Sequence, residues 1–155
     1  MTNKRSLLWT IPLPLIFGFL SGKIWKVDQW YDKLKKPALN PPKIVFPIAW
    51  TILYLLIGLS YYVIFLRLNT FHHPLVYLMI AHLFINYSYT PAFFYYKQIL
   101  LSAIICLLTW ITAVYLYIVF WDYDKTGLAS YLLIPYIMWL LFANYLAWTI
   151  YWLSK

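Results

Sequence analysis

The chain has 155 residues, of which 65% are hydrophobic and only 10% are charged. A soluble domain of this size is closer to half apolar and a quarter charged, so water is excluded as the solvent for most of its surface. An aromatic share of 23% excludes intrinsic disorder, and the single cysteine, Cys106, excludes a disulfide scaffold. These features predict a small protein that crosses a membrane several times.

Five stretches have the roughly 20 mostly apolar residues that a spanning helix needs. The first, residues 6–21, follows Lys4 and Arg5 and carries Pro12 and Pro14. This profile is also typical of a signal peptide, but no small-x-small cleavage site precedes the next lysines, so we expect a retained first helix. The other spans are expected at residues 44–66, 74–96, 99–121 and 128–153.

The backbone of these stretches would have no hydrogen-bond partners in lipid unless it were helical. The sequence therefore predicts one all-α domain over residues 1–155, a five-helix transmembrane bundle. Its one long connection, residues 22–43, is expected to be an ordered first loop, because long ordered loops often cover or bind ligands. Lys97 and Gln98 form a very tight connection between the third and fourth spans.

The net charge of +8 comes from 12 basic and 4 acidic residues, and no nucleic-acid module accompanies it. We therefore expect no nucleic-acid binding. Five spans place four basic residues on the N-terminal side and eight on the side of the first loop. Because cytoplasmic loops collect Lys and Arg, the first loop and the C-terminus are predicted to be cytoplasmic, in a membrane that the sequence does not specify.

No soluble-enzyme motif or metal-binding cysteine pair is present. The only carboxylates lie in loops, which argues against an ion-coupled transporter. In the third span His82 and Asn86 share a helix face, followed by Tyr89 and Phe93 at helical spacing. This polar stripe could line a ligand cavity or join helices by hydrogen bonds.

Two tryptophans, Trp50 and Trp139, lie too deep in their spans to belong to an interfacial aromatic belt. Trp139 shares one helix face with Phe142, Ala143 and Leu146. The small side chain of Ala143 leaves room on that face. The space could be filled by a neighbouring helix or by a small molecule.

Three segments together resemble the translocator protein family, also called tryptophan-rich sensory proteins or peripheral-type benzodiazepine receptors. The first is residues 30–42, WYDKLKKPALNPP, with Trp50 following. The second is residues 86–94, NYSYTPAFF, which is similar to the family pattern N-W-x-W-x-P-x-F-F. The third is residues 129–146, ASYLLIPYIMWLLFANYL, in the last span. The resemblance covers nearly the whole chain in the same order.

The resemblance implies a five-helix bundle, often a homodimer, with a cavity that opens toward the first loop. It implies binding of protoporphyrin IX, haem-like tetrapyrroles and drug-like isoquinoline or benzodiazepine ligands, with porphyrin as ligand or substrate and no cofactor or metal. The ligand-binding positions that carry over are Tyr31, Pro41, Trp50, His82, Asn86, Tyr89, Phe93, Trp139 and Ala143.

The chain departs from the family pattern at several positions. Tyr87 and Tyr89 replace the tryptophans of the third span, and Leu39 replaces the aromatic residue of the loop. The sterol-recognition segment of animal members is echoed only loosely, by Leu146, Tyr151 and Lys155.

Three functions follow from the resemblance. The first is a membrane receptor that senses, sequesters or transports tetrapyrroles, with the lysines of the first loop stabilising the propionates. The second is an enzyme that degrades porphyrin with light and oxygen, with Trp50 and Trp139 as the catalytic residues. The third is a transporter of sterol or other lipid.

Overall fold

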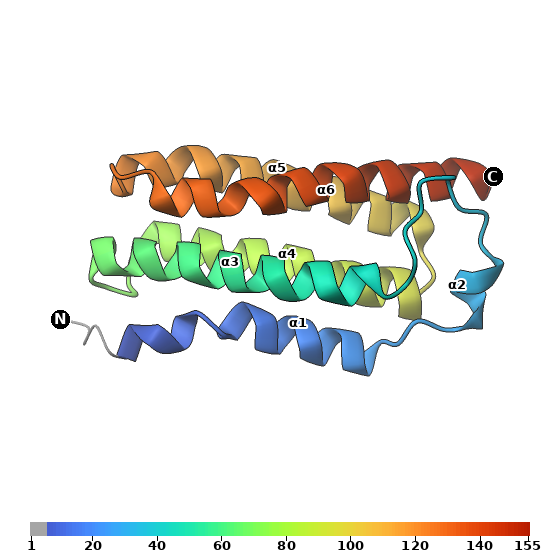
Figure 1. Ribbon diagram of the computed structural model, residues 1–155, viewed down its shortest axis with the longest axis horizontal. Helices are drawn as coiled ribbons and strands as arrows, with labels where there is room; N and C mark the ends of the chain where they lie inside the picture. The colour runs from blue at the N-terminus through green and yellow to red at the C-terminus, as the bar shows by residue number, and fades with distance from the viewer. Residues whose placement is uncertain (1–5) are drawn as a thin grey trace.

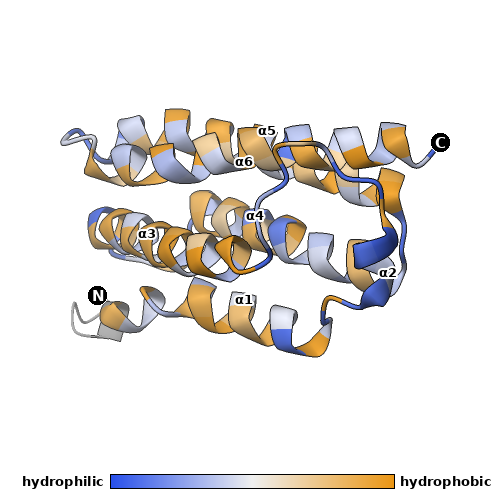
Figure 2. Ribbon diagram, turned by 45° about the vertical axis from the view of Figure 1, so that its right-hand side comes forward, coloured by the Kyte–Doolittle hydropathy of each residue, from blue (hydrophilic) through white to orange (hydrophobic). Residues whose placement is uncertain are grey.

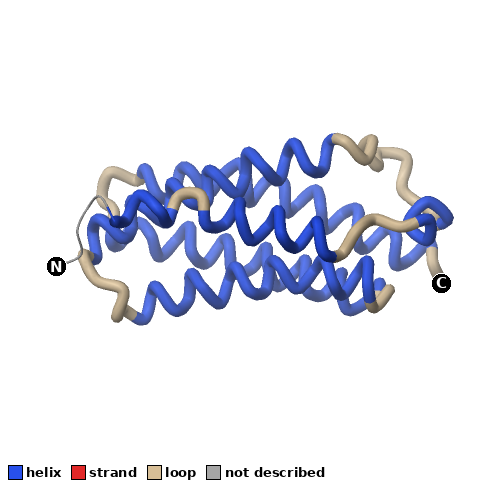
Figure 3. Tube along the Cα trace, turned by 90° about the horizontal axis from the view of Figure 1, so that it is seen from below, coloured by secondary structure: helices blue, strands red, loops and turns tan. Residues whose placement is uncertain are grey.

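The structure, a computed structural model, describes residues 6–155. Within that range it contains helices, turns and loops but no strand, as Figure 3 shows. The elements are η1 (Ser6–Thr10), α1 (Leu13–Ile24), α2 (Gln29–Lys33), α3 (Val45–Leu68), α4 (Pro74–Thr90), the π-helix η2 (Pro91–Tyr95), α5 (Ile99–Tyr123) and α6 (Leu128–Leu153). The all-helical prediction is confirmed for these residues. The bounds of α3, α5 and α6 lie within two residues of the expected ranges, whereas the expected first span is broken into η1 and α1 and the third into α4 and η2.

The long helices α1, α3, α4, α5 and α6 run alongside one another as a single bundle (Figure 1). α6 packs against α3 and α5, α4 packs against α5, and α1 packs against α3 and α4. The short helix α2 and the C-terminus lie at the same end of the bundle (Figure 1). Hydrophilic residues gather on α2 and its flanking loop, whereas the long helices are mostly apolar (Figure 2).

Three of the helices, α3, α5 and α6, are long and apolar enough to cross a membrane by length and composition. A shorter apolar helical stretch runs from Leu8 to Ile24. Many large apolar side chains on the outside of the bundle are exposed, among them Phe84, Ile118 and Met138. This outward apolar surface is typical of helices that face lipid.

The N-terminal helical stretch is broken between η1 and α1, where Pro12 precedes the first α-helical residue. The break lies against Gly58 of α3. A Cβ atom at Gly58 would lie only 1.9 Å from the carbonyl oxygen of Ile11. Glycine is therefore required at position 58, because any side chain would force the bent segment away from α3.

The first loop is more structured than expected, because it contains the helix α2. The carboxylate of Asp28 caps this helix by accepting hydrogen bonds from the backbone N–H groups of Trp30, at 3.1 Å, and Tyr31, at 3.4 Å. Such an N-cap satisfies donors that a helix of one turn cannot pair internally. The sequence signal was present in Asp28, but five residues are too few for a periodic pattern.

The opposite end of the bundle is closed by Asp124, which is fully buried in the connection between α5 and α6. Its carboxylate accepts hydrogen bonds from the Thr126 hydroxyl at 2.7 Å, the Ala129 N–H at 3.0 Å and Arg67 Nη2 at 3.0 Å. Burial acts to raise the pKa of Asp124, but these hydrogen bonds outweigh it and lower the pKa below the usual value. One ionised carboxylate thus ties the end of α3 to the start of α6.

Candidate functional site

A cavity of about 660 Å³ lies inside the bundle at the end covered by the first loop. All five long helices contribute to it, together with α2 and the loop around it. Its lining consists of Leu15, Gly18, Phe19, Gly22, Lys23, Trp25, Val27, Tyr31, Asn40, Lys43, Phe46, Pro47, Trp50, Thr51, Tyr54, Asn86, Tyr89, Thr90, Phe93, Phe94, Cys106, Thr109, Trp139, Leu140, Ala143, Leu146 and Ile150. The volume is that of a site for a small molecule.

One part of the wall is a cluster of aromatic side chains from α3 and α6. The rings of Trp50 and Tyr54 stack with their centroids 5.2 Å apart. Trp50 and Trp139 meet edge to face, at a centroid distance of 6.5 Å and an interplanar angle of 86°. The two tryptophans that the sequence singled out are therefore in contact on the same cavity, although they lie in different helices.

A second part of the wall comes from the end of α4 and from η2. Pro91 has no N–H to donate, so the α-helical pattern fails there and a π-helix follows. The N–H of Tyr96 bonds to the carbonyl of Pro91 at 2.9 Å, five residues back. In this segment the rings of Tyr89 and Phe93 stack, 5.6 Å apart and nearly parallel.

The polar part of the wall is built around Asn86, which is 5% exposed. Its side-chain oxygen accepts a hydrogen bond from the Tyr54 hydroxyl at 2.9 Å, and its amide nitrogen donates to the Tyr136 hydroxyl. Asn86 thus links α4 to α3 and to α6 while lining the cavity. Sequence analysis left open whether this residue joins helices or faces a cavity, and it does both.

The first loop covers the cavity through Tyr31 of α2. This ring packs edge to face on Phe93, at a centroid distance of 6.1 Å, and lies 4.6 Å below the Lys36 ammonium. Its hydroxyl contacts the side-chain oxygen of Asn40 at 3.5 Å. Tyr31, held by these contacts, forms part of the wall at the end that the first loop covers.

Two ion pairs fix this cover in place. Asp28 pairs with Lys97 of the α4–α5 connection at 3.0 Å, and Asp32 pairs with Lys43 just before α3. The pKa of Asp28 lies below its usual value, chiefly because the Lys97 side chain donates a hydrogen bond to the carboxylate. The loop is therefore attached by charge to both neighbouring connections, although these contacts are exposed and weaken in salt.

Seven of the nine predicted ligand-binding residues line the cavity, and His82 and Pro41 do not. His82 is buried one helical turn before Asn86, and its ring nitrogens lie 2.7 Å from the Thr112 hydroxyl and 3.0 Å from the Tyr136 hydroxyl. Both nitrogens are therefore occupied by helix-to-helix hydrogen bonds. In the loop, Asn40 lines the cavity in place of its neighbour Pro41.

Sequence analysis missed the contribution of α1, in particular Gly18, Gly22 and Lys23. Small residues four apart on one helix face are a signal for close packing or for a cavity, and this signal was available. Cys106 and Thr109 of α5 were also missed. Among residues 6–155, no group of three or more His, Cys, Asp or Glu side chains is arranged to hold a metal ion.

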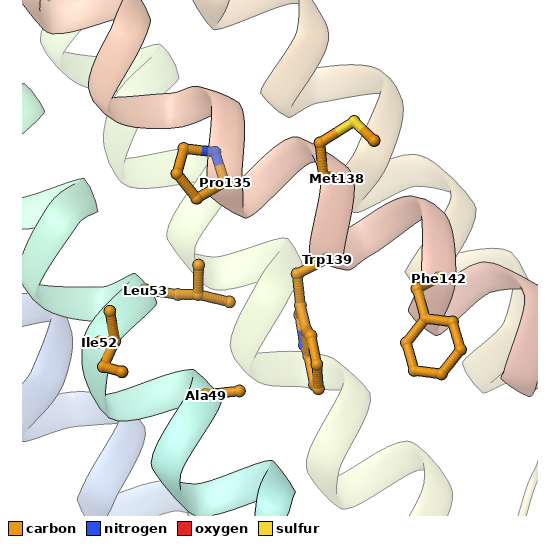
Figure 4. Close-up of a pocket in the computed structure, with 7 residues that line it drawn as sticks. All are labelled: Ala49, Ile52, Leu53, Pro135, Met138, Trp139 and Phe142. Atoms are coloured by element: carbon orange, nitrogen blue, oxygen red, sulfur yellow. The ribbon is translucent and has the colours of Figure 1, made fainter. Parts of the chain in front are cut away.

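A second hollow lies on the outer surface between α3 and α6 (Figure 4). It is lined by Ala49, Ile52, Leu53, Pro135, Met138, Trp139 and Phe142. In Figure 4 the indole of Trp139 projects from α6 toward α3. Because Trp139 also lines the internal cavity, this single side chain forms part of both walls.

Apolar helices around an aromatic internal cavity define a helical membrane protein with a ligand-sized site. The sequence model of the TspO/MBR family matches residues 10–153, and the chain belongs to this family. The resemblance inferred from the three sequence segments is thereby confirmed.

Similar proteins occur in bacteria and animals. The Tryptophan-rich protein TspO of Bacillus cereus is 31% identical over 97% of this chain and 98% of its own length. The Tryptophan-rich sensory protein of Cereibacter sphaeroides is 34% identical over 77% of this chain and 73% of its own. The Translocator protein of Sus scrofa is 32% identical over 88% of this chain and 84% of its own.

Proposed function

We propose that this chain binds tetrapyrroles, such as protoporphyrin IX and haem-related compounds, in the cavity beneath the first loop. The observation that carries the proposal is the aromatic lining formed by Trp50, Trp139, Tyr89 and Phe93. A flat macrocycle gains a large stacking area on such walls. Isoquinoline- and benzodiazepine-type compounds are a second class of flat ligand for the same surfaces.

The role of this binding is sensing, sequestration or transport. The names of two relatives, a sensory protein and a translocator protein, describe functions of those proteins that fit ligand binding within a membrane. In this chain the cavity lies at the end of the bundle that the first loop covers, so that a bound ligand would contact residues of that loop.

The proposal includes five membrane crossings, by α1, α3, α4 with η2, α5 and α6. The apolar stretch Leu8–Ile24 reaches the shorter end of the usual span length of about 17–25 residues. The 17 residues of α4 continue directly into the 5 residues of η2, so that together they are long enough to cross. The lysines of the first loop support a cytoplasmic location for that end of the bundle.

A titration of purified protein with protoporphyrin IX in the dark tests binding, with the porphyrin absorbance as the signal. We expect saturable binding to protein in lipid nanodiscs and none to empty nanodiscs. Ala143→Phe should weaken binding about tenfold or more, because the larger side chain fills part of the cavity. Ala81→Phe adds the same volume on the exposed outer face of α4 and should leave binding unchanged.

Two results would contradict the proposal. One is porphyrin uptake by the protein that matches uptake by empty nanodiscs. The other is equal affinity in Ala143→Phe and wild type when both unfold at the same temperature, because the ligand would then lie outside this cavity.

A second candidate function is light- and oxygen-dependent breakdown of the bound porphyrin. The edge-to-face contact of Trp50 and Trp139 on the cavity favours it, because indole is the side chain that most readily gives an electron to an excited porphyrin. Dioxygen would be the terminal oxidant. Illuminating the complex and looking for a product distinguishes this function from binding alone.

A further inference from the structure

The internal cavity and the outer hollow between α3 and α6 meet at one side chain. Among residues 6–155, Trp139 is the only residue that belongs to the lining of both. Its indole projects from α6 toward α3, on the side of Ala49 and Leu53 (Figure 4). The ring is therefore a partition between an inner space of about 660 Å³ and an outer hollow of about 440 Å³.

The hollow lies on a face of the bundle that borders lipid. Its seven lining residues carry no charge, and the indole N–H of Trp139 is their only polar side-chain group. Ile52 and Met138, which belong to this lining, are exposed on the outside of the bundle. Both α3 and α6 are long and apolar enough to cross a membrane. A molecule dissolved in the hydrocarbon of the bilayer therefore reaches this hollow without crossing a charged surface.

The loop end of the cavity presents a different surface. There the ion pairs of Asp28 with Lys97 and of Asp32 with Lys43 attach the first loop to the neighbouring connections. A flat apolar molecule that entered at this end would have to leave the hydrocarbon and pass these charged side chains. Such a transfer is unfavourable, because apolar surface is exposed to water.

Trp139 is held in place by ring contacts and not by a hydrogen bond. Its indole N–H is buried without a hydrogen-bond partner among residues 6–155, although a buried tryptophan N–H usually has one. The ring packs on Phe46, Trp50 and Phe142, at centroid distances of 6.1, 6.5 and 5.8 Å. One turn earlier, Pro135 has no N–H to donate, so α6 lacks an internal hydrogen bond there. Rotation of the indole therefore breaks no hydrogen bond of its side chain.

We propose that the hollow between α3 and α6 is an entry site for flat, largely apolar molecules dissolved in the bilayer, with Trp139 as the side chain that opens it to the internal cavity. This inference rests on the proposed function and adds the route of the ligand to it. When the indole rotates away from α3, the hollow and the cavity become one space. When the indole returns, it restores the cavity wall and stacks on the ligand inside.

The experiment measures the rates of protoporphyrin IX binding as well as its affinity, with the protein in nanodiscs of zwitterionic lipid. Association is followed by porphyrin absorbance after mixing, and dissociation after dilution into an excess of empty liposomes. Ala49→Trp fills the hollow from a position that does not line the cavity. We expect it to slow association and dissociation alike, about tenfold, and to leave the affinity unchanged, because an obstacle on the path raises the barrier in both directions.

A second variant and a control complete the set. Ile52→Trp also adds volume at the hollow, and because Ile52 is 54% exposed, the larger ring has room on the lipid side. It should slow both rates in the same way. Ala81→Trp is the matched control, since Ala81 lies on the exposed face of α4 and lines neither space, and it should change neither rate. Unfolding temperatures equal to that of wild type show that each variant keeps the fold.

Equal slowing of both rates in either hollow variant, with the affinity of wild type, supports the inference. Wild-type rates in both variants overturn it. A weaker affinity that comes from faster dissociation alone also overturns it, because the substitutions would then act on the cavity. Faster exchange in Lys97→Gln, which detaches the first loop from one neighbour, together with wild-type rates in the hollow variants, assigns entry to the loop end instead.

The wild type decides separately on the proposed function. Saturable binding of protoporphyrin IX to wild type leaves that function intact even where the hollow variants overturn the entry route. If wild type binds no more porphyrin than empty nanodiscs do, the proposed function itself fails.

Discussion

The hydroxyl group of Tyr136 lies 3.0 Å from Nε2 of His82, and together with the hydrogen bond from the Asn86 amide this contact joins α6 to α4 inside the bundle. The Thr112 hydroxyl donates its hydrogen to a backbone carbonyl of its own helix, so it accepts a hydrogen bond from Nδ1 of His82. Nε2 is then an acceptor, and the ring proton lies on Nδ1, which donates to Thr112 at 2.7 Å. The Thr112 hydroxyl donates onward to the Leu108 carbonyl at 2.9 Å.

The first prediction is that His82 stabilises the bundle and does not bind the ligand. His82→Leu leaves the hydroxyl groups of Thr112 and Tyr136 without their shared partner. We expect a loss of about 0.6–1.7 kcal/mol in the free energy of unfolding, the range for hydrogen bonds between membrane helices. Thermal unfolding in detergent measures it. Porphyrin affinity should be unchanged, and a weaker affinity at normal stability would make His82 a binding residue.

The second prediction concerns the tryptophan pair. In the double variant Trp50→Phe/Trp139→Phe, light-driven porphyrin breakdown should fall sharply while dark binding largely remains. Phenyl rings keep an aromatic face for stacking but are much harder to oxidise than indole. Product formation is followed by absorbance under illumination. A wild type that yields no product beyond bleaching of free porphyrin would leave binding as the only function. If the double variant breaks down porphyrin at the wild-type rate, the two indoles serve only as a surface on which the ligand stacks.

The third prediction is a loss of stability in acid that depends on Asp124. The pKa of Asp124 is lower in the folded protein than its usual 3.8. The ionised carboxylate therefore stabilises the fold at pH values above 3.8, and this stabilisation is lost as the pH falls from there through the lower pKa of the folded protein. Asp124→Asn should cost about 1–2 kcal/mol at pH 7, because the amide forms weaker bonds and Arg67 is half exposed.

Unfolding temperatures between pH 7 and pH 3 measure this effect. The difference in unfolding temperature between wild type and Asp124→Asn should become smaller as the pH falls. Asp122→Asn is the control, since its carboxylate is exposed and lies 4.0 Å from Lys125. A difference in unfolding temperature that stays constant across this pH range would show that the charge of Asp124 contributes nothing to stability.

The fourth prediction concerns orientation in the membrane. A reporter fused after Lys155 should read as cytoplasmic, because that end of the bundle carries the lysine-rich first loop. A reporter fused after His72, in the α3–α4 connection at the other end (Figure 1), should read as external. The reverse pair of readings would overturn the predicted orientation, and two readings on the same side would overturn the number of crossings.

The sequence predicted the long helices well because each is a long apolar run bounded by charged, proline or glycine residues. It did not predict the π-helix at Pro91–Tyr95, because a proline in a helical pattern indicates a kink or an end without specifying its geometry. The sequence also did not predict α2, because a helix of 5 residues is too short to show a periodic pattern.

For the site, residues that stack or hydrogen-bond were predictable because their types are unusual inside a membrane span. Trp50, Asn86 and Trp139 all line the cavity. The different settings of His82 and Asn86 were not predictable from spacing alone. Residues four apart are rotated by about 40° and displaced by about 6 Å along a helix, which is enough to place one in the core and the other on the cavity wall.

The hydrogen bonds that Asn86 forms within the bundle also limit the number of hydrogen bonds that it can form with a ligand. A side-chain amide offers two N–H donors and two acceptor lone pairs. The Tyr54 hydroxyl donates to one lone pair of the amide oxygen, and the Tyr136 hydroxyl accepts one of the two N–H groups. One donor and one acceptor, side by side and uncharged, are left for a molecule in the cavity. Deep in the bundle this favours a ligand that presents a complementary neutral pair, such as an amide or a lactam edge. A ligand that forms more hydrogen bonds with Asn86 must replace the bonds to Tyr54 or Tyr136, which would weaken the contact between α3, α4 and α6.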